Sequence, residues 1–252
     1  MALCERKTQK ETMKDIPTKE KDNTFVSNDN FDIYAKTYRE TLSSCLKGFG
    51  KNDAFFDILK VDSVKKWVIN DSYIYEILDF GCGIGKLTGL LAKNFQRSSV
   101  YGYDISKESL CVARKENAAI KNAFFIDNLP VETRYDIIIA ANIFHHIIPG
   151  ERIKILCEIK KLLKPQGKIV FFEHNPFNPF TRYIVKMCPF DIGVKLIRLH
   201  ELIKTIESSG FKIEIKHYIL FLPWPSRVFR EIEHWLRHLP AGAQYFIVAA
   251  HK

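Results

Sequence analysis

The sequence has no apolar run of about 18 residues, the length that crosses a membrane. Its N-terminus is charged and lacks the apolar segment of a signal peptide, so we expect no leader. No CxxC pair and no cysteine–histidine spacing typical of zinc occurs, and the six cysteines are scattered. These absences predict reduced thiols, no metal site and a cytoplasmic location.

The net charge of +9 has several readings. It is compatible with nucleic acid, an anionic membrane surface or an acidic substrate as a partner, or with a solvated lysine-rich surface. The lysines are spread along the whole chain, which favours the solvated surface. Residues 1–28 have too few apolar side chains to build a core, so we expect a flexible tail there and a single domain over 29–252.

The most informative stretch is DFGCGIGKLT, which begins at Asp79. It follows an apolar run, carries glycines at positions 81, 83 and 85, and precedes a run that suits a helix. Glycine permits positive φ and close approach of a ligand to the backbone. A helix N-terminus adds unpaired N–H groups at the same place. The stretch therefore predicts a strand, a tight turn and a helix start that hold a nucleotide-like ligand.

Strands and helices alternate along the rest of the chain. We expect strands at 74–80, 100–104, 123–126, 135–140, 168–172, 211–220 and 244–250, and helices at 86–95, 106–119, 151–163 and 199–208. This alternation predicts an α/β fold with a Rossmann-like, doubly wound and mostly parallel sheet of seven strands, here the core over 73–252. Two helices, near 31–46 and 53–68, form an N-terminal helical cap over 31–68.

Two insertions, 174–198 and 222–242, are longer than such a fold needs. Both leave the C-terminal end of a strand, where ligands of open α/β sheets bind, so we expect them to lie over the ligand. Prolines at 176 and 179 are expected to block a helix in the first insertion. The second contains a basic amphipathic segment, 225–239, which we expect to be a lid, with peripheral membrane contact as the alternative. A lid and a membrane-contacting segment both favour an apolar or amphiphilic substrate.

Asp104 narrows the choice of nucleotide. It stands at the end of the second strand, about 20 residues after the glycine turn, where an acidic side chain accepts hydrogen bonds from ribose hydroxyls. A dinucleotide and S-adenosylmethionine both fit this arrangement. The spacing GxGxG, with Asp79 before it, differs from the dinucleotide pattern GxGxxG and favours S-adenosylmethionine.

The chain resembles the class I S-adenosylmethionine-dependent methyltransferases, within them the small-molecule branch that includes ubiquinone-biosynthesis-type enzymes (methyltransferase types 11 and 12). The segments that carry the resemblance are, in order, ILDFGCGIGKLT, YDIS, FFIDNLP, YDIIIAANIFHHI and LLKPQGKIVFFE. The resemblance is clear over about 31–173 and looser beyond. It implies methyl transfer from S-adenosyl-L-methionine, and a final strand that is antiparallel.

The resemblance also implies a set of cofactor-binding residues. By this resemblance, Asp79 and the glycine turn would hold the methionine part of S-adenosylmethionine, and Asp104 would bind its ribose. Ile105 would pack on the adenine ring, and Asp127 with Asn128 would bind the adenine amino group. The full set is Tyr34, Asp79, Gly81, Cys82, Gly83, Gly85, Asp104, Ile105, Asp127, Asn128, Ala141 and Asn142. The last two would line the sulfonium side. The tyrosine belongs to an N-terminal helix expected to close over the cofactor, although core packing explains its aromatic stripe equally well.

Methyl transfer to a hydroxyl or a carbon acid needs a group that removes a proton, and histidine suits that task. His145 and His146 follow the fourth strand, where many small-molecule O-methyltransferases carry an LHD segment with a catalytic histidine. An ungapped alignment puts His145 on that base, while His146 replaces the acid, and a packing role for the pair stays open. His174, beside Glu173 after the fifth strand, is the second candidate, with orientation of its loop as the alternative.

Two other functions remain open. A nucleic-acid methyltransferase would explain the charge, but the fourth strand ends in AANIF instead of an Asn-Pro-Pro-aromatic motif, and no clustered basic stripe is present. A non-catalytic S-adenosylmethionine-binding protein would keep the glycine turn and Asp104. We therefore expect an apolar or amphiphilic small molecule as the methyl acceptor, methylated at oxygen, carbon or nitrogen. Nucleic acid is not the expected acceptor. The sequence does not predict the oligomeric state.

Overall fold

A computed structural model describes residues 54–70, 72–130, 132–191, 193–221 and 235–252, together with the single residues 32, 35, 37, 41 and 45. The expected tail over 1–28, most of the helix near 31–46 with Tyr34, and residues 222–234 of the second insertion lie outside the described residues. No helix in the described ranges is long and apolar enough to cross a membrane.

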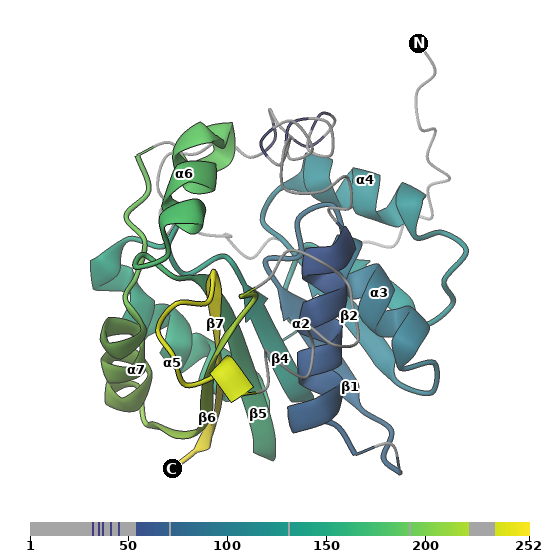
Figure 1. Ribbon diagram of the computed structural model, residues 1–252. Helices are drawn as coiled ribbons and strands as arrows, with labels where there is room; N and C mark the ends of the chain where they lie inside the picture. The colour runs from purple at the N-terminus through teal and green to yellow at the C-terminus, as the bar shows by residue number, and fades with distance from the viewer. Residues whose placement is uncertain are drawn as a thin grey trace, which may run out of the picture.

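Seven strands form one sheet in the order β3-β2-β1-β4-β5-β7-β6 (Figure 1). They are β1 (Glu76–Phe80), β2 (Ser99–Tyr103), β3 (Ala123–Ile126), β4 (Tyr135–Ala141), β5 (Leu163–His174), β6 (Phe211–Ile219) and β7 (Gln244–His251). The pairings from β3 through β5 are parallel, whereas β7 runs antiparallel to both β5 and β6. The predicted Rossmann-like sheet with an antiparallel last strand is confirmed.

Helices cover both faces of the sheet (Figure 1). The helices are α2 (Ala54–Trp67), α3 (Lys86–Asn94), α4 (Lys107–Glu116), α5 (Arg152–Leu162), α6 (Pro179–Met187) and α7 (Leu199–Ser208). Strand β4 shows the reason: Ile137 and Ile139 pack in one buried cluster with α2 and α3, while Ile138 and Ala140 pack in the other with α5 and α7. A strand buried on both sides needs a continuous apolar run, which YDIIIAA supplies.

The strand order reverses between β1 and β4, because β2 and β3 continue the sheet on one side of β1 and β5 on the far side of β4. The C-terminal ends of β1, β2 and β4 therefore meet at one edge, next to the point of reversal. Open α/β sheets bind their ligands at such a point. The sequence places the glycine turn, Asp104 and Asn142 directly after these three strand ends.

The first insertion departs from its expected loop. Helix α6 begins at Pro179, so the expectation that the prolines block a helix is wrong. Proline is tolerated at the first helical position, where its missing N–H would have no partner within the helix. Asn178 caps this helix, because its side-chain oxygen accepts a hydrogen bond of 3.0 Å from the N–H of Thr181. A short 3-10 helix, η3 (Pro189–Asp191), follows.

Most predicted boundaries hold within a few residues, and the largest difference is at β5. The ladder pairs Tyr135 with Leu163 and then Ile137 with Lys168, so KPQG is an irregularity inside β5 instead of a loop before it. A bulge of this kind leaves the rest of the strand in register. The predicted strand 168–172 lies within β5, which continues to His174 at the ligand side of the sheet.

Candidate active site

A cavity of about 490 Å³ lies at the C-terminal ends of β1, β2, β4 and β5. Ligand pockets have volumes of roughly 300–1,000 Å³. The predicted site residues in its wall are Asp79, Gly81, Cys82, Gly83, Asp104, Ile105, Ala141, Asn142, His145, His146 and His174. One cavity thus joins the residues predicted for a cofactor to those predicted for catalysis.

The glycine turn is tied to the neighbouring strand and leaves one backbone face open. The N–H groups of Gly81 and Cys82 both donate to the carbonyl of Tyr103, at 2.8 and 2.9 Å. Gly83 has a φ of 53°, and a Cβ built on it meets nothing within 4 Å. Among the described residues, none would contact a Cβ at Gly83, so a ligand in the cavity has room to approach this backbone closely.

Gly85 is required for close packing between the glycine turn and its neighbours, β3 and α4. Its φ is 75°, and a Cβ there would lie 2.7 Å from the ring of Phe125 and 2.9 Å from the Cβ of Ala113. It is absent from the residues that line the cavity. Glycine at this position lets the start of α3 pack against α4 and β3, and a direct contact of Gly85 with a cofactor stays a prediction.

The Asp104 carboxylate is held by two backbone donors. Its Oδ2 accepts from the N–H of Gly83 at 2.7 Å, and its Oδ1 accepts from the N–H of Ser106 at 2.9 Å. Burial raises the pKa of Asp104, and these hydrogen bonds oppose that rise. Each carboxylate oxygen has capacity for a further bond, so this fixed carboxylate is suited to accept hydrogen bonds from a diol.

Asp79 and a group of charged residues form the wall beyond the turn. Burial raises the pKa of Asp79 to about 7, while its Oδ2 accepts a 2.6 Å hydrogen bond from Thr88. Asp57 lies between Lys60 at 3.1 Å and Lys86 at 3.4 Å, and these two charges hold the pKa of Asp57 low against the effect of burial. Sequence reasoning missed these three cavity residues, because two of them lie on α2, which carries no motif.

Described residues of the N-terminal segment reach the same cavity. Ala35 lines it, and Asp32 accepts a 2.5 Å hydrogen bond from the Ser106 hydroxyl, beside Asp104. The same N-terminal segment also contacts α6, because the thiol of Cys45 lies 3.6 Å from the carbonyl oxygen of Met187. The cap over the ligand stays a prediction, and Tyr34 lies outside the described residues.

Asn142 and Leu220 have left-handed backbone conformations, with φ of 56° and 63°, and both line the cavity. Non-glycine residues in this region are strained and occur preferentially at functional sites. Asn142 is held there by a 3.2 Å hydrogen bond from Gln244. Asp127 and Asn128, which bond to each other, are not part of the cavity wall, and their role in adenine binding stays a prediction.

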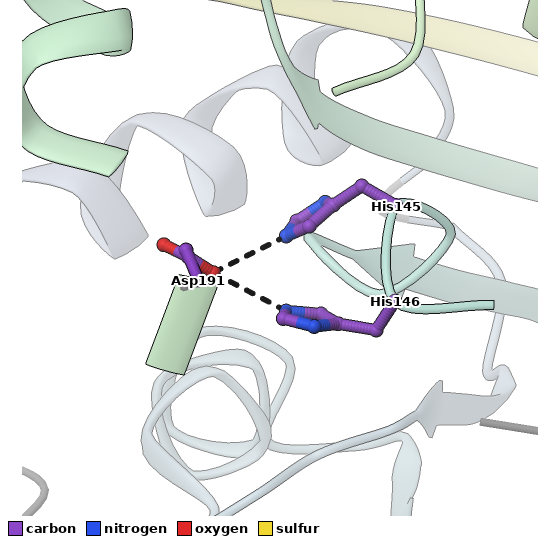
Figure 2. A group of neighbouring side chains, drawn as sticks. All are labelled: His145, His146 and Asp191. Atoms are coloured by element: carbon purple, nitrogen blue, oxygen red, sulfur yellow. Dashed lines mark ion pairs between the residues drawn. The ribbon is translucent and has the colours of Figure 1, made fainter. Parts of the chain in front are cut away.

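Two carboxylates, Glu173 and Asp191, lie beside the histidines. Figure 2 shows Asp191 with His145 and His146. The Nδ1 of His145 lies 2.6 Å from Oε2 of Glu173, whose Oε1 accepts from the N–H of Phe144 at 2.7 Å. The Nε2 atoms of His145 and His146 both face Oδ1 of Asp191, at 3.6 and 3.3 Å. Asp191 is a residue that sequence reasoning missed, because it lies in the first insertion and no local pattern connects it to the histidines.

The pKa values of His145 and His174 are shifted in opposite directions. Burial alone would lower the pKa of His145, but Glu173 and Asp191 raise it to about 9. Burial, and then the charge on His145, lower the pKa of His174 to about 4. At neutral pH this arrangement keeps His174 uncharged, and its side chain makes no hydrogen bond within the part of the chain that the structure describes.

The sheet order, the antiparallel last strand and the glycine turn after β1 define the class I fold of S-adenosylmethionine-dependent methyltransferases. Solved structures of that class share the fold. Magnesium protoporphyrin IX methyltransferase from Synechocystis PCC 6803 with bound SAH has a TM-score of 0.60 at 18% identity, over 88% of this chain and 97% of that one. A possible histamine N-methyltransferase from Thermotoga maritima gives 0.61 at 16% identity, over 88% and 98%.

Within that class, residues 78–169 match a family described as a methyltransferase domain. The chain is 31% identical to malonyl-[acyl-carrier protein] O-methyltransferase of Halalkalibacterium halodurans, over 42% of this chain and 41% of that protein. The corresponding protein of Priestia megaterium is 28% identical, over 56% and 48%. The chain thus spans less than half the length of these curated relatives.

Proposed function

We propose that this chain transfers a methyl group from S-adenosylmethionine to a small apolar or amphiphilic acceptor. The observation that carries the proposal is that the wall of one cavity contains both the glycine turn with Asp104 and the three histidines. When bound, S-adenosylmethionine supplies a methyl group already activated by a sulfonium. The protein then has to hold the cofactor, align the acceptor and accept a proton.

The residues at the glycine-turn end fit this cofactor. Gly83 has no neighbour at its Cβ position within the described ranges, and Asp104 presents a carboxylate fixed by two N–H donors, which suits the ribose hydroxyls. Ile105 is 46% exposed at the cavity edge, so its apolar side chain is available to pack against an adenine ring. The acidic wall residue Asp79 suits the cationic ammonium of the methionine part.

The cavity as a whole has a mostly apolar wall. Its apolar side chains include Ile143, Ile147, Ile155, Ile184 and Leu220. An apolar wall gains free energy by burying apolar surface of a ligand, at roughly 25 cal/mol for each Å². This supports an apolar or amphiphilic acceptor, and the O-methyltransferase names of two relatives favour oxygen as the accepting atom over carbon or nitrogen.

His174 is the favoured proton acceptor among the three predicted histidines. It lies in the cavity wall, and no side-chain hydrogen bond within the described ranges occupies its ring nitrogens. His145, in contrast, is engaged by Glu173 through one nitrogen and faces Asp191 through the other. A base must have a free nitrogen within reach of the proton it removes, and the position of His174 in the cavity wall supports this role.

The test is formation of S-adenosylhomocysteine from S-adenosylmethionine by the purified full chain, against a panel of amphiphilic hydroxy and carboxy compounds, with short RNA and DNA as parallel acceptors. We expect turnover with at least one amphiphile and none with nucleic acid. Turnover with nucleic acid only would refute the acceptor class. Calorimetric binding of S-adenosylhomocysteine without turnover on any acceptor would favour the non-catalytic alternative.

Two further expectations belong to this proposal. The cysteines that the structure describes are all free, which supports a cytoplasmic location. Peripheral membrane contact through 225–239 stays a prediction: of that segment only 235–239 is described, and Trp235 there is 81% exposed. Flotation of the chain with vesicles of anionic lipid would test it.

A further inference from the structure

We propose that His145, His146 and Asp191 bind a divalent transition-metal ion at the acceptor end of the cavity. These three side chains offer two imidazole nitrogens and a carboxylate oxygen, and the ligand atoms all lie within 4.8 Å of one another. Figure 2 shows both imidazole rings turned toward the Asp191 carboxylate. The site itself stands on this geometry, whereas its role in methylation rests on the proposed function.

The distances suit a common metal centre. Metal bonds of about 2.0–2.1 Å at angles between an octahedral and a tetrahedral arrangement place neighbouring ligand atoms roughly 3.0–3.4 Å apart. Asp191 Oδ1 lies 3.3 Å from the Nε2 of His146 and 3.6 Å from the Nε2 of His145. All three ligand atoms lie within 4.8 Å of one another, and rotations of the side chains that bring them closer would place them on one ion.

The hydrogen-bond partners of His145 also support a metal site. Histidines that bind metals usually donate their other ring N–H to a carboxylate or carbonyl, which fixes the ring orientation. His145 has that arrangement: its Nδ1 lies 2.6 Å from Glu173, and Glu173 is itself fixed by the N–H of Phe144. Nε2 of His145 is thereby aimed at Asp191 and at the cavity.

The ligand set indicates which metals fit. Two imidazoles with one carboxylate suit Zn²⁺, Fe²⁺, Co²⁺ or Ni²⁺, whereas Mg²⁺ and Ca²⁺ prefer oxygen ligands. Three protein ligands leave further coordination positions for a substrate. All three residues line the cavity, so those positions face the acceptor end. A cation there would orient an acceptor oxygen and stabilise the negative charge that develops on it.

The experiment measures Co²⁺ binding by visible absorption and calorimetry, using the full chain without a polyhistidine tag after treatment with EDTA and dialysis. We expect one Co²⁺ for each chain, displaced by Zn²⁺. The variants Asp191→Asn and His146→Ala should weaken binding at least tenfold. Glu173→Gln should weaken it by about 10- to 100-fold through the orientation of His145. His145 itself is not replaced, because Glu173 would lose its partner while buried.

The matched control is His200→Ala, which removes an exposed histidine on α7 away from the cavity and should leave Co²⁺ affinity unchanged. Circular dichroism verifies that each variant is folded. Absence of Co²⁺ binding to the native chain, or equal binding to Asp191→Asn and the native chain, would overturn the site in favour of plain histidine–carboxylate ion pairs.

The failure of this site is distinguishable from failure of the proposed function. Calorimetry with S-adenosylhomocysteine on the metal-free chain reports on the cofactor end alone. Cofactor binding without Co²⁺ binding refutes only the metal site. Co²⁺ binding without cofactor binding supports the metal site and refutes the methyltransferase proposal.

Discussion

Asp104→Ala is the substitution that probes the cofactor end most directly. The Asp104 carboxylate accepts hydrogen bonds from Gly83 and Ser106, at 2.7 and 2.9 Å, and lines the cavity beside Ile105. Removing it has two consequences. The ribose hydroxyls lose a charged acceptor, and the N–H of Gly83 loses the group that fixes the glycine turn.

The loss of the charged hydrogen-bond acceptor sets the expected decrease in cofactor affinity. A hydrogen bond to a charged group contributes about 1.5–3 kcal/mol, which corresponds to a change of roughly 10- to 100-fold in affinity. Loosening of the turn adds to this, so we expect S-adenosylhomocysteine to bind at least about tenfold more weakly to Asp104→Ala. The pKa of Asp104 is raised by burial, which makes the loss smaller at acidic pH, where the carboxyl is partly protonated.

The assay is calorimetric titration with S-adenosylhomocysteine at neutral pH. The matched control is Glu108→Ala, which removes an exposed carboxylate in the first turn of α4, the helix that follows Asp104, outside the cavity wall. We expect the control to bind like the native chain. If Asp104→Ala remains folded and binds within about threefold of the native chain, the ribose assignment is refuted, since that difference is under 1 kcal/mol.

Four further substitutions probe Asp79, two glycines of the turn and the cap of α6. Burial raises the pKa of Asp79 from 3.8 to about 7, so the folded chain keeps a proton that the unfolded chain releases and loses stability as the pH rises through this interval. Urea unfolding without cofactor should therefore show Asp79→Asn gaining about 2–3 kcal/mol relative to the native chain between about pH 5 and 8, and a pH-independent difference would contradict the assignment. Gly85→Ala should cost roughly 2–4 kcal/mol of stability, from positive φ and the clash with Phe125, whereas Gly83→Ala should cost roughly 1–2 kcal/mol and mainly weaken S-adenosylhomocysteine binding; equal effects on stability and binding would refute the division of roles. Asn178→Ala removes the cap of α6 and a 2.7 Å bond to the carbonyl of Ala241, so thermal unfolding should show a loss of about 2 kcal/mol, and an unchanged melting temperature would argue against that cap.

The fold was predictable because its signals are local. The glycine turn, the apolar run of β4 and the alternation of strands and helices each depend on neighbouring residues, and each is found where the pattern put it. The helix α6 was missed because proline was read as a helix breaker. At Pro179 it occupies the first helical position, with Asn178 as the cap, so the same residue begins the helix.

The site was predictable only in part, for a related reason. Residues that follow strand ends, such as Asp104 and His174, are placed by the topology of the sheet, and the sequence pattern determines that topology. Asp191, Asp57 and Lys60 reach the cavity from an insertion and from an N-terminal helix, whose positions depend on tertiary packing. No spacing in the sequence connects them to the residues they meet.

A crystal structure of the full chain with S-adenosylhomocysteine would test the central claim most directly. The account predicts the ribose hydroxyls within hydrogen-bond distance of the Asp104 carboxylate, and the sulfur directed toward the end of the cavity that holds His145 and His174. A ligand bound elsewhere, or bound in this cavity with its sulfur directed away from the histidines, would contradict it.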